Sequence, residues 1–172
     1  MDKNQRARTI MPVNIAIMIA AEVILTRFIS INTPLLRISF GFIPVVIVAI
    51  MYGPLWAGTA YAIGDIIGAL LFPIGAFFPG YTLSAFLTGL VYGLFLHKDE
   101  LKLNYVIISC AIVMFAINLG LGTLWLTMLT GKGYIALLPA RALKELIEFP
   151  VCVVIITIIN ATVVRYAKKQ IS

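Results

Sequence analysis

The chain has 172 residues, of which 62% are hydrophobic and only 12% are charged. Soluble domains are typically about 45–50% apolar and about 25% charged, so this composition excludes a soluble globular protein and predicts an integral membrane protein. The formal net charge is +6, and no polar stretch is long enough to form a separate soluble domain. We therefore expect a single membrane domain over residues 1–172.

The apolar segments leave room for six transmembrane helices in one compact all-α bundle, at about 20 residues per spanning helix. We expect these helices at about residues 11–31, 40–52, 55–72, 81–96, 105–128 and 139–166. The first helix follows a basic segment, MDKNQRARTI, that superficially resembles a signal peptide. The apolar run after it is too long for a cleaved signal and does not end in a small-x-small cleavage site, so we interpret it as a retained helix.

The positive charges predict the orientation of the bundle, because six spans place both termini on one side. The basic residues near the two termini and after the fourth helix all fall on that side: Lys3, Arg6, Arg8, Lys98, Lys102, Arg165, Lys168 and Lys169. An excess of Lys and Arg marks the cytoplasmic side. We therefore expect cytoplasmic termini and outward-facing loops after the first, third and fifth helices.

The segment from Gly64 to Ser84, GDIIGALLFPIGAFFPGYTLS, connects the third and fourth helices. It begins with a carboxylate, Asp65, in an apolar run, and then prolines and glycines alternate with phenylalanines. A carboxylate inside a membrane is costly, and it usually marks a functional site. We interpret the segment as a lid over a small-molecule site that opens to the outside.

Further charged residues lie mostly in the outer half of the bundle: Glu22, Arg27, Arg37, Lys132, Arg141, Lys144, Glu145 and Glu148. The last four form one stripe, spaced i, i+3, i+4 and i+7 on the sixth helix. They could neutralise one another as Arg141–Glu145 and Lys144–Glu148 pairs, or they could line a cavity. Glu148 lies about 13 Å below the outer end at about 1.5 Å per residue, a depth comparable to that of Arg27 and Asp65. This agreement in depth favours one shared pocket.

Aromatic and polar side chains at the outer helix ends complete the expected site. Phe78 and Tyr81 belong to the lid region, and Asn118 and Trp125 lie on the outer half of the fifth helix. Each aromatic side chain alone is also typical of the belt at a membrane interface. Together, flat surfaces, carboxylates that accept from N–H groups and cations for an anionic tail suit a planar heteroaromatic ligand that carries carboxylates.

Catalytic and metal-binding motifs are absent from the sequence. There is no HExxH, GxSxG, acid-rich metal motif or P-loop, so we expect no enzyme activity, no ATP hydrolysis by this chain alone, no metal and no cofactor. Cys110 and Cys152 lie in separate apolar runs. We expect them to be inert small hydrophobic residues without a disulfide.

Two stretches carry a resemblance to a known family: ILTRFISINTPLLRISFGFIPVVIVAIMYGPLWAG and DIIGALLFPIGAFFPGYTLSAFLTGLVYGLFL. Their wording and order resemble the folate-specific S component of energy-coupling factor (ECF) transporters. The resemblance implies a six-helix subunit of the prokaryotic plasma membrane that binds folate or a related pterin tightly from the outside. It also implies a transmembrane coupling protein and two cytoplasmic ATPases as partners. In such families an alanine-x-x-x-alanine motif on the first helix docks the coupling protein, and Ala16 and Ala20 match it.

The resemblance also implies how substrate is delivered: the subunit topples within the bilayer, and the loops after the first and third helices gate the pocket. Prolines would restrict these loops and glycines would permit bends, at Pro34, Pro73, Gly75, Pro79 and Gly80.

We expect the charged and aromatic residues to divide the ligand among them. Asp65 or Glu148 would accept from the N–H groups of the pterin, and Phe78, Tyr81 and Trp125 would supply stacking surfaces. Arg27 and Arg37 would pair with polar or anionic groups, and Arg141 or Lys144 would meet the glutamate tail. Three alternatives stay open: an S component for another heterocyclic vitamin, an integral membrane enzyme, and a structural protein whose charges are merely paired.

Overall fold

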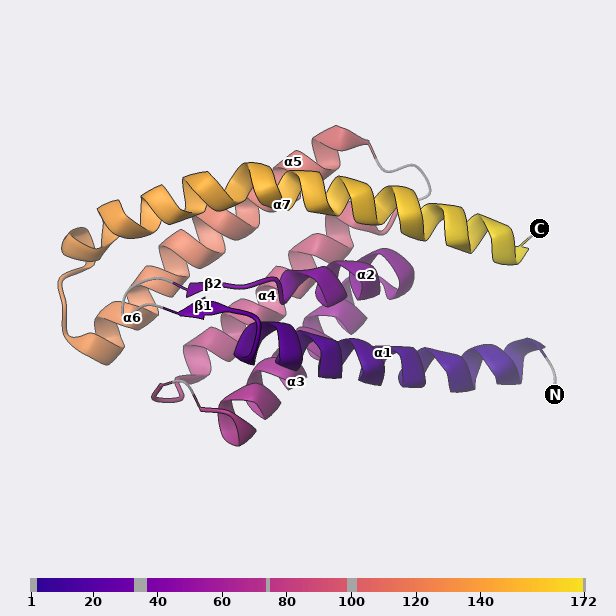
Figure 1. Cartoon of the computed structure of the whole chain (residues 1–172), viewed down its shortest axis with the longest axis horizontal. Helices are drawn as coiled ribbons and strands as arrows, with labels where there is room; N and C mark the ends of the chain where they lie inside the picture. Colours follow the sequence, from indigo (N-terminus) through magenta and orange to yellow (C-terminus); the bar gives the residue numbers. More distant parts are fainter. Residues whose placement is uncertain (1–2, 33–36, 74, 99–101, 172) are drawn as a thin grey trace.

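The computed structural model describes residues 3–32, 37–73, 75–98 and 102–171, with side chains for residues 10–30, 39–73, 75–98 and 102–162. Figure 1 shows a bundle of long helices, with α7 along one side and α1 along the other. The helices are α1 (Lys3–Arg27), α2 (Phe42–Tyr52), α3 (Pro54–Leu71), α4 (Pro79–Leu96), α5 (Leu103–Ala111), the π-helical segment η1 (Ile112–Leu121), α6 (Gly122–Thr130) and α7 (Tyr134–Ile171). Two short strands, β1 (Ile31–Asn32) and β2 (Arg37–Ile38), pair antiparallel with Ile31 opposite Ile38.

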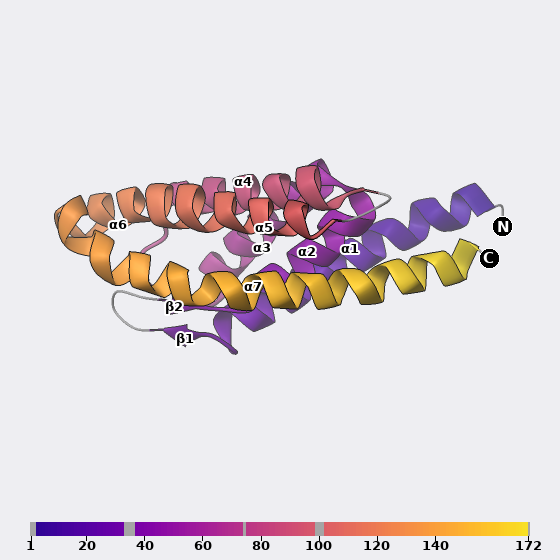
Figure 2. The same cartoon turned by 90° about the horizontal axis from the view of Figure 1, so that it is seen from above.

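Length and composition confirm the prediction of a helical membrane protein. Among the described residues, four helices are long and apolar enough to cross a membrane: Ile10–Arg27, Pro54–Leu71, Pro79–Leu96 and Leu103–Thr130. The last of these joins α5, η1 and α6 into one helix, and α2 is a shorter apolar helix. The start of α1 and the end of α7 lie at the same end of the bundle in both views (Figures 1 and 2).

Three predicted helices begin and end within two residues of α2, α3 and α4. Glycine and proline mark these boundaries. Gly53 has a φ of +87°, a conformation that only glycine adopts readily, and Pro54 is the first residue of α3. Pro79 and Gly80, which the sequence placed in the lid, form the first turn of α4 instead, because proline suits the first helical position.

The ends of the other helices differ more from the prediction. The first helix was expected at residues 11–31, but α1 covers Lys3–Arg27: Lys, Arg and Gln in the basic segment are good helix formers, and the chain after Arg27 enters the β1–β2 ladder. The sixth was expected to begin at Pro139, but α7 begins at Tyr134. Pro139 is the sixth residue of α7, so the helix runs through the proline that the sequence analysis took as its start, as it also does through Pro150. The fifth was expected at 105–128 and covers 103–130, with an unforeseen π segment.

Helices α3 and α4 approach so closely that their backbones touch at glycines. A Cβ atom added to Gly89 would lie 2.4 Å from the carbonyl oxygen of Ala57, and one added to Gly93 would contact Cα of Pro54. Small residues permit such approach between membrane helices. Gly89 and Gly93 therefore allow the close approach of α3 and α4.

Replacement of Gly89 by alanine should destabilise the protein, because the added methyl group meets backbone atoms that cannot rotate away. Overpacking of this kind typically costs about 1–3 kcal/mol. We expect a lower unfolding temperature of the detergent-purified Gly89→Ala variant in a thermal denaturation assay. Gly75→Ala is the matched control, since a Cβ atom there meets nothing within 4 Å. Equal stability of the two variants would contradict the close contact.

Candidate binding site

A cavity of about 420 Å³ lies inside the bundle. Its wall is formed mainly by residues of α1, α3, α4, η1 and α7. Ser39 and Phe40 before α2, Phe42 at the start of α2 and Gly122 at the start of α6 complete it. Small-molecule sites typically have volumes of about 300–1,000 Å³, so the cavity can enclose a ligand of vitamin size. It contains charged side chains of both signs from three helices.

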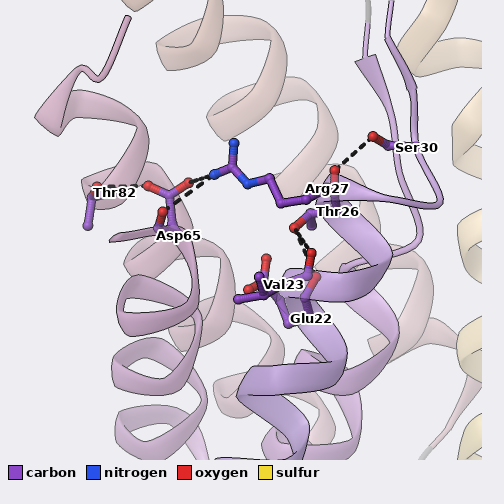
Figure 3. Close-up of polar contacts among 7 residues, drawn as sticks. All are labelled: Glu22, Val23, Thr26, Arg27, Ser30, Asp65 and Thr82. Carbon is purple, nitrogen blue, oxygen red and sulfur yellow. Dashed lines mark hydrogen bonds and ion pairs between the residues drawn. The ribbon is translucent and has the colours of Figure 1, made fainter. Parts of the chain in front are cut away.

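On one side of the cavity, Arg27 of α1 pairs with Asp65 of α3 (Figure 3). The Arg27 Nη2 atom lies 3.7 Å from Asp65 Oδ1 and donates to the Asp65 carbonyl oxygen at 3.4 Å. Thr82 of α4 donates to Asp65 Oδ2 at 2.8 Å. The Arg27 side chain is only 8% exposed, and its Nε has no hydrogen-bond partner among the described residues. This Nε is almost inaccessible to solvent and lies against Gly68 of α3.

Below this pair, Glu22 and Thr26 of α1 also face the cavity. Thr26 Oγ1 donates to the carbonyl oxygens of Glu22 and Val23, at 2.9 and 3.2 Å (Figure 3). Glycines on α3 make room for the charged side chains: a Cβ atom on Gly64 would contact Glu22 Oε2, and one on Gly68 would lie 2.5 Å from Arg27 Nε. Gly64 and Gly68 therefore accommodate the charged groups of α1.

On the opposite side, α7 contributes a bridged group of charges. Lys144 Nζ lies 3.0 Å from Glu145 Oε1 and 2.9 Å from Glu148 Oε2. Arg141 Nη2 donates to the carbonyl oxygen of Asn118, on η1, at 3.0 Å. The anticipated Lys144–Glu148 pair is therefore confirmed. The anticipated Arg141–Glu145 pair is wrong, because Arg141 extends across to η1 and Lys144 binds both glutamates.

The comparisons with known proteins identify the family. The family described as "ECF transporter, substrate-specific component" matches residues 12–160. The chain belongs to this family. Folate transporter FolT of Clostridium novyi (strain NT) is 44% identical over 141 residues, which are 82% of each chain. Folate transporter FolT of Leuconostoc mesenteroides subsp. mesenteroides is 33% identical over 164 residues, covering 91% of this chain and 88% of that relative.

A solved structure, described as FolT bound with folic acid, has the same fold with a TM-score of 0.82. It is 37% identical in sequence, and the match covers 86% of this chain and 90% of that one. The relatives are transporter components, so this S component is a transport protein and the alternative of a membrane enzyme is set aside.

Most of the site residues expected from the sequence line the cavity of this S component. They are Arg27, Asp65, Tyr81, Asn118, Arg141, Lys144 and Glu148. The backbone of Arg37 lies in β2, and its side chain falls outside the described part of the structure, as does all of Pro34.

Phe78 and Trp125 are not among the residues that line the cavity, but each contacts a residue that does. Their ring centroids are 5.6 Å apart, and Phe78 also meets the Tyr81 ring edge-on at 6.4 Å. Trp125 Nε1 donates to Ser84 Oγ at 3.0 Å, and both Ser84 and Tyr81 line the cavity. The expected stacking role stays a prediction, and in this arrangement the two aromatic side chains contact residues of the wall.

Sequence reasoning did not assign a ligand role to several polar residues of the wall: Glu22, Thr26, Ser84, Thr88 and Glu145. Two spacings could have revealed them. Glu22 and Thr26 are four residues apart in an apolar helix, and so are Ser84 and Thr88. Polar side chains repeated at that interval share one helix face, and inside a membrane such a face points to the protein interior or a cavity.

The site is equipped for binding. Among buried side-chain atoms in the described residues, Arg27 Nε, Arg141 Nε and Glu145 Oε2 lack hydrogen-bond partners. These atoms are almost inaccessible to solvent, so a ligand can pair with them only if the side chains move. Within the described residues, no group of three or more His, Cys, Asp or Glu is placed to hold a metal ion.

Proposed function

We propose that this S component is the high-affinity folate-binding subunit of an ECF-type vitamin importer. One observation carries the proposal: the chain is 44% identical to a folate transporter FolT and shares the fold of FolT bound with folic acid. The cavity agrees with it, because folate has a pterin ring with N–H donors and a glutamate tail with two carboxylates. Carboxylates and cations for these groups line the cavity.

The proposed topology has six membrane helices in one domain over residues 1–172 of a prokaryotic plasma membrane. The spans would be α1, α2, α3, α4, the continuous helix Leu103–Thr130 and α7. The start of α1 and the end of α7 lie at one end of the bundle (Figure 1), and the basic residues of these segments favour the cytoplasmic side. The cavity would then receive folate from the outside.

The proposed binding roles follow the two sides of the cavity. Asp65 on α3, or Glu148 on α7, accepts from the amino and ring N–H groups of the pterin, and Tyr81 provides the neighbouring aromatic surface. Arg141 or Lys144 meets the glutamate tail, since arginine forks match carboxylates. The remaining members of the proposed site are Arg27, Arg37, Asn118 and, behind the wall, Phe78 and Trp125.

The connection between α3 and α4 is proposed to gate the site, together with the loop that contains Pro34. Residues 72–78 join the two helices, and they include Pro73 and Gly75. Pro79 and Gly80 fix the return into α4. A Cβ atom on Gly80 would lie 2.5 Å from the Phe78 ring and 2.6 Å from the Trp125 ring, so a glycine is needed where the gate meets these aromatic side chains.

Delivery to the cytoplasm is proposed to need a transmembrane coupling protein and two cytoplasmic ATPases, against which the S component topples. The docking surface would include Ala16 and Ala20, which are exposed one turn apart on α1. Their apolar neighbours Val13, Ile17 and Ile24 are 50–56% exposed. A face of small side chains lets another helix approach closely.

The Ala16→Arg variant should lose assembly with the coupling protein and ATPases but keep folate binding. A long charged side chain separates the helices, and Ala16 lies outside the cavity wall. Co-purification of the complex measures assembly, and a folate titration of the isolated S component measures binding. Leu94→Arg, an exposed position on α4, is the matched control for a charge on the apolar surface. Full assembly of Ala16→Arg would contradict the docking role.

A titration of the detergent-purified S component with folate tests the proposed function itself. The chain has two tryptophans: Trp56 is 50% exposed on α3, whereas Trp125 bonds to the cavity residue Ser84. In a Trp56→Phe background, folate should quench the remaining Trp125 signal with one-to-one saturation at submicromolar concentration. Calorimetry gives the stoichiometry. A folded protein that binds another heterocyclic vitamin and not folate would reject the folate assignment and support an S component of different specificity.

A further inference from the structure

A pair of thiols lies at the edge of the cavity and has no part in the proposed binding of folate. Cys110 of α5 and Cys152 of α7 are the two cysteines of the chain, and both are free. Their sulfur atoms are 3.6 Å apart, within hydrogen-bonding contact. The hydroxyl oxygen of Tyr92, on α4, lies 3.5 Å from Cys152 Sγ. Three helices therefore meet at one sulfur, although the sequence alone predicted two unrelated hydrophobic side chains.

The thiols are buried in the protein but adjoin the cavity. Cys110 is 0% and Cys152 is 2% exposed, and Tyr92 is 1% exposed. Cys152 and Tyr92 both belong to the cavity wall, whereas Cys110 lies behind Cys152. A small uncharged reagent that enters the cavity therefore reaches Cys152 first and finds the second thiol already in contact with it.

The donor set decides which thiol-binding group fits. A structural zinc site usually needs about four protein ligands, and among the described residues no group of three metal-binding side chains is present. A trivalent arsenical of the form R–As=O needs only two thiols, which it bonds at roughly a right angle, while its organic group keeps the third position. Two sulfurs already in contact suit that geometry.

We propose that Cys110 and Cys152 form a dithiol site that is bridged by trivalent arsenicals entering through the cavity. Each thiol gives its proton to the arsenic-bound oxygen, two As–S bonds form, and the As=O bond is replaced as the oxygen leaves in one molecule of water. Arsenic stays trivalent, so the step needs no oxidant or reductant. The bridge joins α5 to α7 beside the cavity.

Phenylarsine oxide tests the site on the full-length protein. After treatment and a wash with excess monothiol, intact mass should show one phenylarsine oxide less one water per chain. Maleimide added under denaturing conditions should label both cysteines of untreated protein and neither cysteine of treated protein. A dithiol such as 2,3-dimercaptopropanol should remove the group and restore both thiols, because it competes as a chelator.

Variants that lack one cysteine distinguish an arsenical bonded to both thiols from one bonded to a single thiol. Cys110→Ser and Cys152→Ser should each fail to retain the arsenical after the monothiol wash, since one As–S bond is readily exchanged. Retention by either variant, absence of an adduct on the parent protein, or loss of both thiols without bound arsenic, as in a disulfide, would overturn the proposal. If a variant does not fold, the parent protein alone still decides the second and third of these outcomes.

Protection by folic acid tests the route through the cavity, and this arm rests on the proposed function. We expect saturating folic acid to slow labelling at least severalfold, with occupancy measured by Trp125 fluorescence in the same sample. Bound folic acid that leaves the labelling rate unchanged would overturn the route. If folic acid does not bind at all, the proposed function fails while the mass and thiol measurements still decide the dithiol site.

Discussion

Replacement of Lys144 by methionine should cause the largest loss of stability of any single change in the cavity wall. Lys144 Nζ is the cation between Glu145 and Glu148, at 3.0 and 2.9 Å. The Glu145 side chain is completely buried, and that of Glu148 is 19% exposed. Methionine keeps the length and apolar stem of lysine but leaves two neighbouring carboxylates without their shared partner.

The expected size follows from the burial of the group. Removal of one partner from a buried ion pair costs about 3–5 kcal/mol. For a chain of this size, that corresponds to a fall in unfolding temperature of about 6–20 °C, at roughly 2–4 °C per kcal/mol. Thermal unfolding of the purified parent protein and of the Lys144→Met variant, in detergent or lipid nanodiscs, measures this fall in unfolding temperature.

A double variant distinguishes lost charge from lost packing. Lys144→Met combined with Glu145→Gln removes the fully buried carboxylate that the single variant leaves uncompensated. We expect it to regain more than half of the lost stability. Lys132→Met is the matched control, because Lys132 is exposed in the connection before α7. A single variant as stable as the parent, or a double variant no more stable than the single one, would show that the bridge does not stabilise the fold.

Much of the helical arrangement could be predicted from the sequence, because membrane-length apolar runs are interrupted by residues that end helices. The predicted helices 40–52 and 55–72 leave Gly53 and Pro54 between them, and in the structure Gly53 separates α2 from α3 while Pro54 begins α3. The N-terminal part of α1 was missed, since hydrophobicity cannot delimit a helix that continues into a basic segment. The π segment η1 was missed because its sequence, IVMFAINLGL, has no motif that distinguishes i+5 from i+4 hydrogen bonding.

The gathering of charges in one cavity was predictable from their depth, but their partners were not. Helical spacing correctly joined Lys144 to Glu148, which lie on the same helix. The same spacing wrongly joined Arg141 to Glu145, because Arg141 finds a carbonyl oxygen on η1, and no local pattern reveals a partner on another helix. The position of Trp125 behind Ser84 likewise depends on how α4 and α6 pack.

Asp65→Asn should weaken folate binding about ten- to hundredfold, since a hydrogen bond to a charged group contributes about 1.5–3 kcal/mol and 1.4 kcal/mol is tenfold in affinity. Asparagine has nearly the same shape as aspartate. It removes the negative charge beside Arg27 and replaces one acceptor oxygen by a donor, which opposes the N–H groups of a pterin. The Trp125 titration in the Trp56→Phe background measures the dissociation constant.

Two threonines provide controls for this change. Thr82→Val removes only the hydroxyl that donates to Asp65 Oδ2, so it should weaken binding by less than tenfold, as expected for one hydrogen bond that orients the carboxylate. Thr59 lies on the exposed face of α3, the helix that carries Asp65. Thr59→Val should therefore leave the affinity for folate unchanged. Unchanged affinity of Asp65→Asn itself would exclude Asp65 from the pterin contact and favour Glu148.

The decisive comparison uses pteroic acid, which is folic acid without its glutamate. If Asp65 contacts the pterin, Asp65→Asn should weaken the binding of both ligands by the same factor, because both make the contact that is lost. Arg141→Gln should weaken the binding of folic acid about tenfold or more and leave the binding of pteroic acid nearly unchanged, since the arginine would contact only the glutamate tail. The opposite pattern, in which Asp65→Asn affects folic acid alone, would mean that the ligand lies in the reverse orientation, with its tail between α1 and α3.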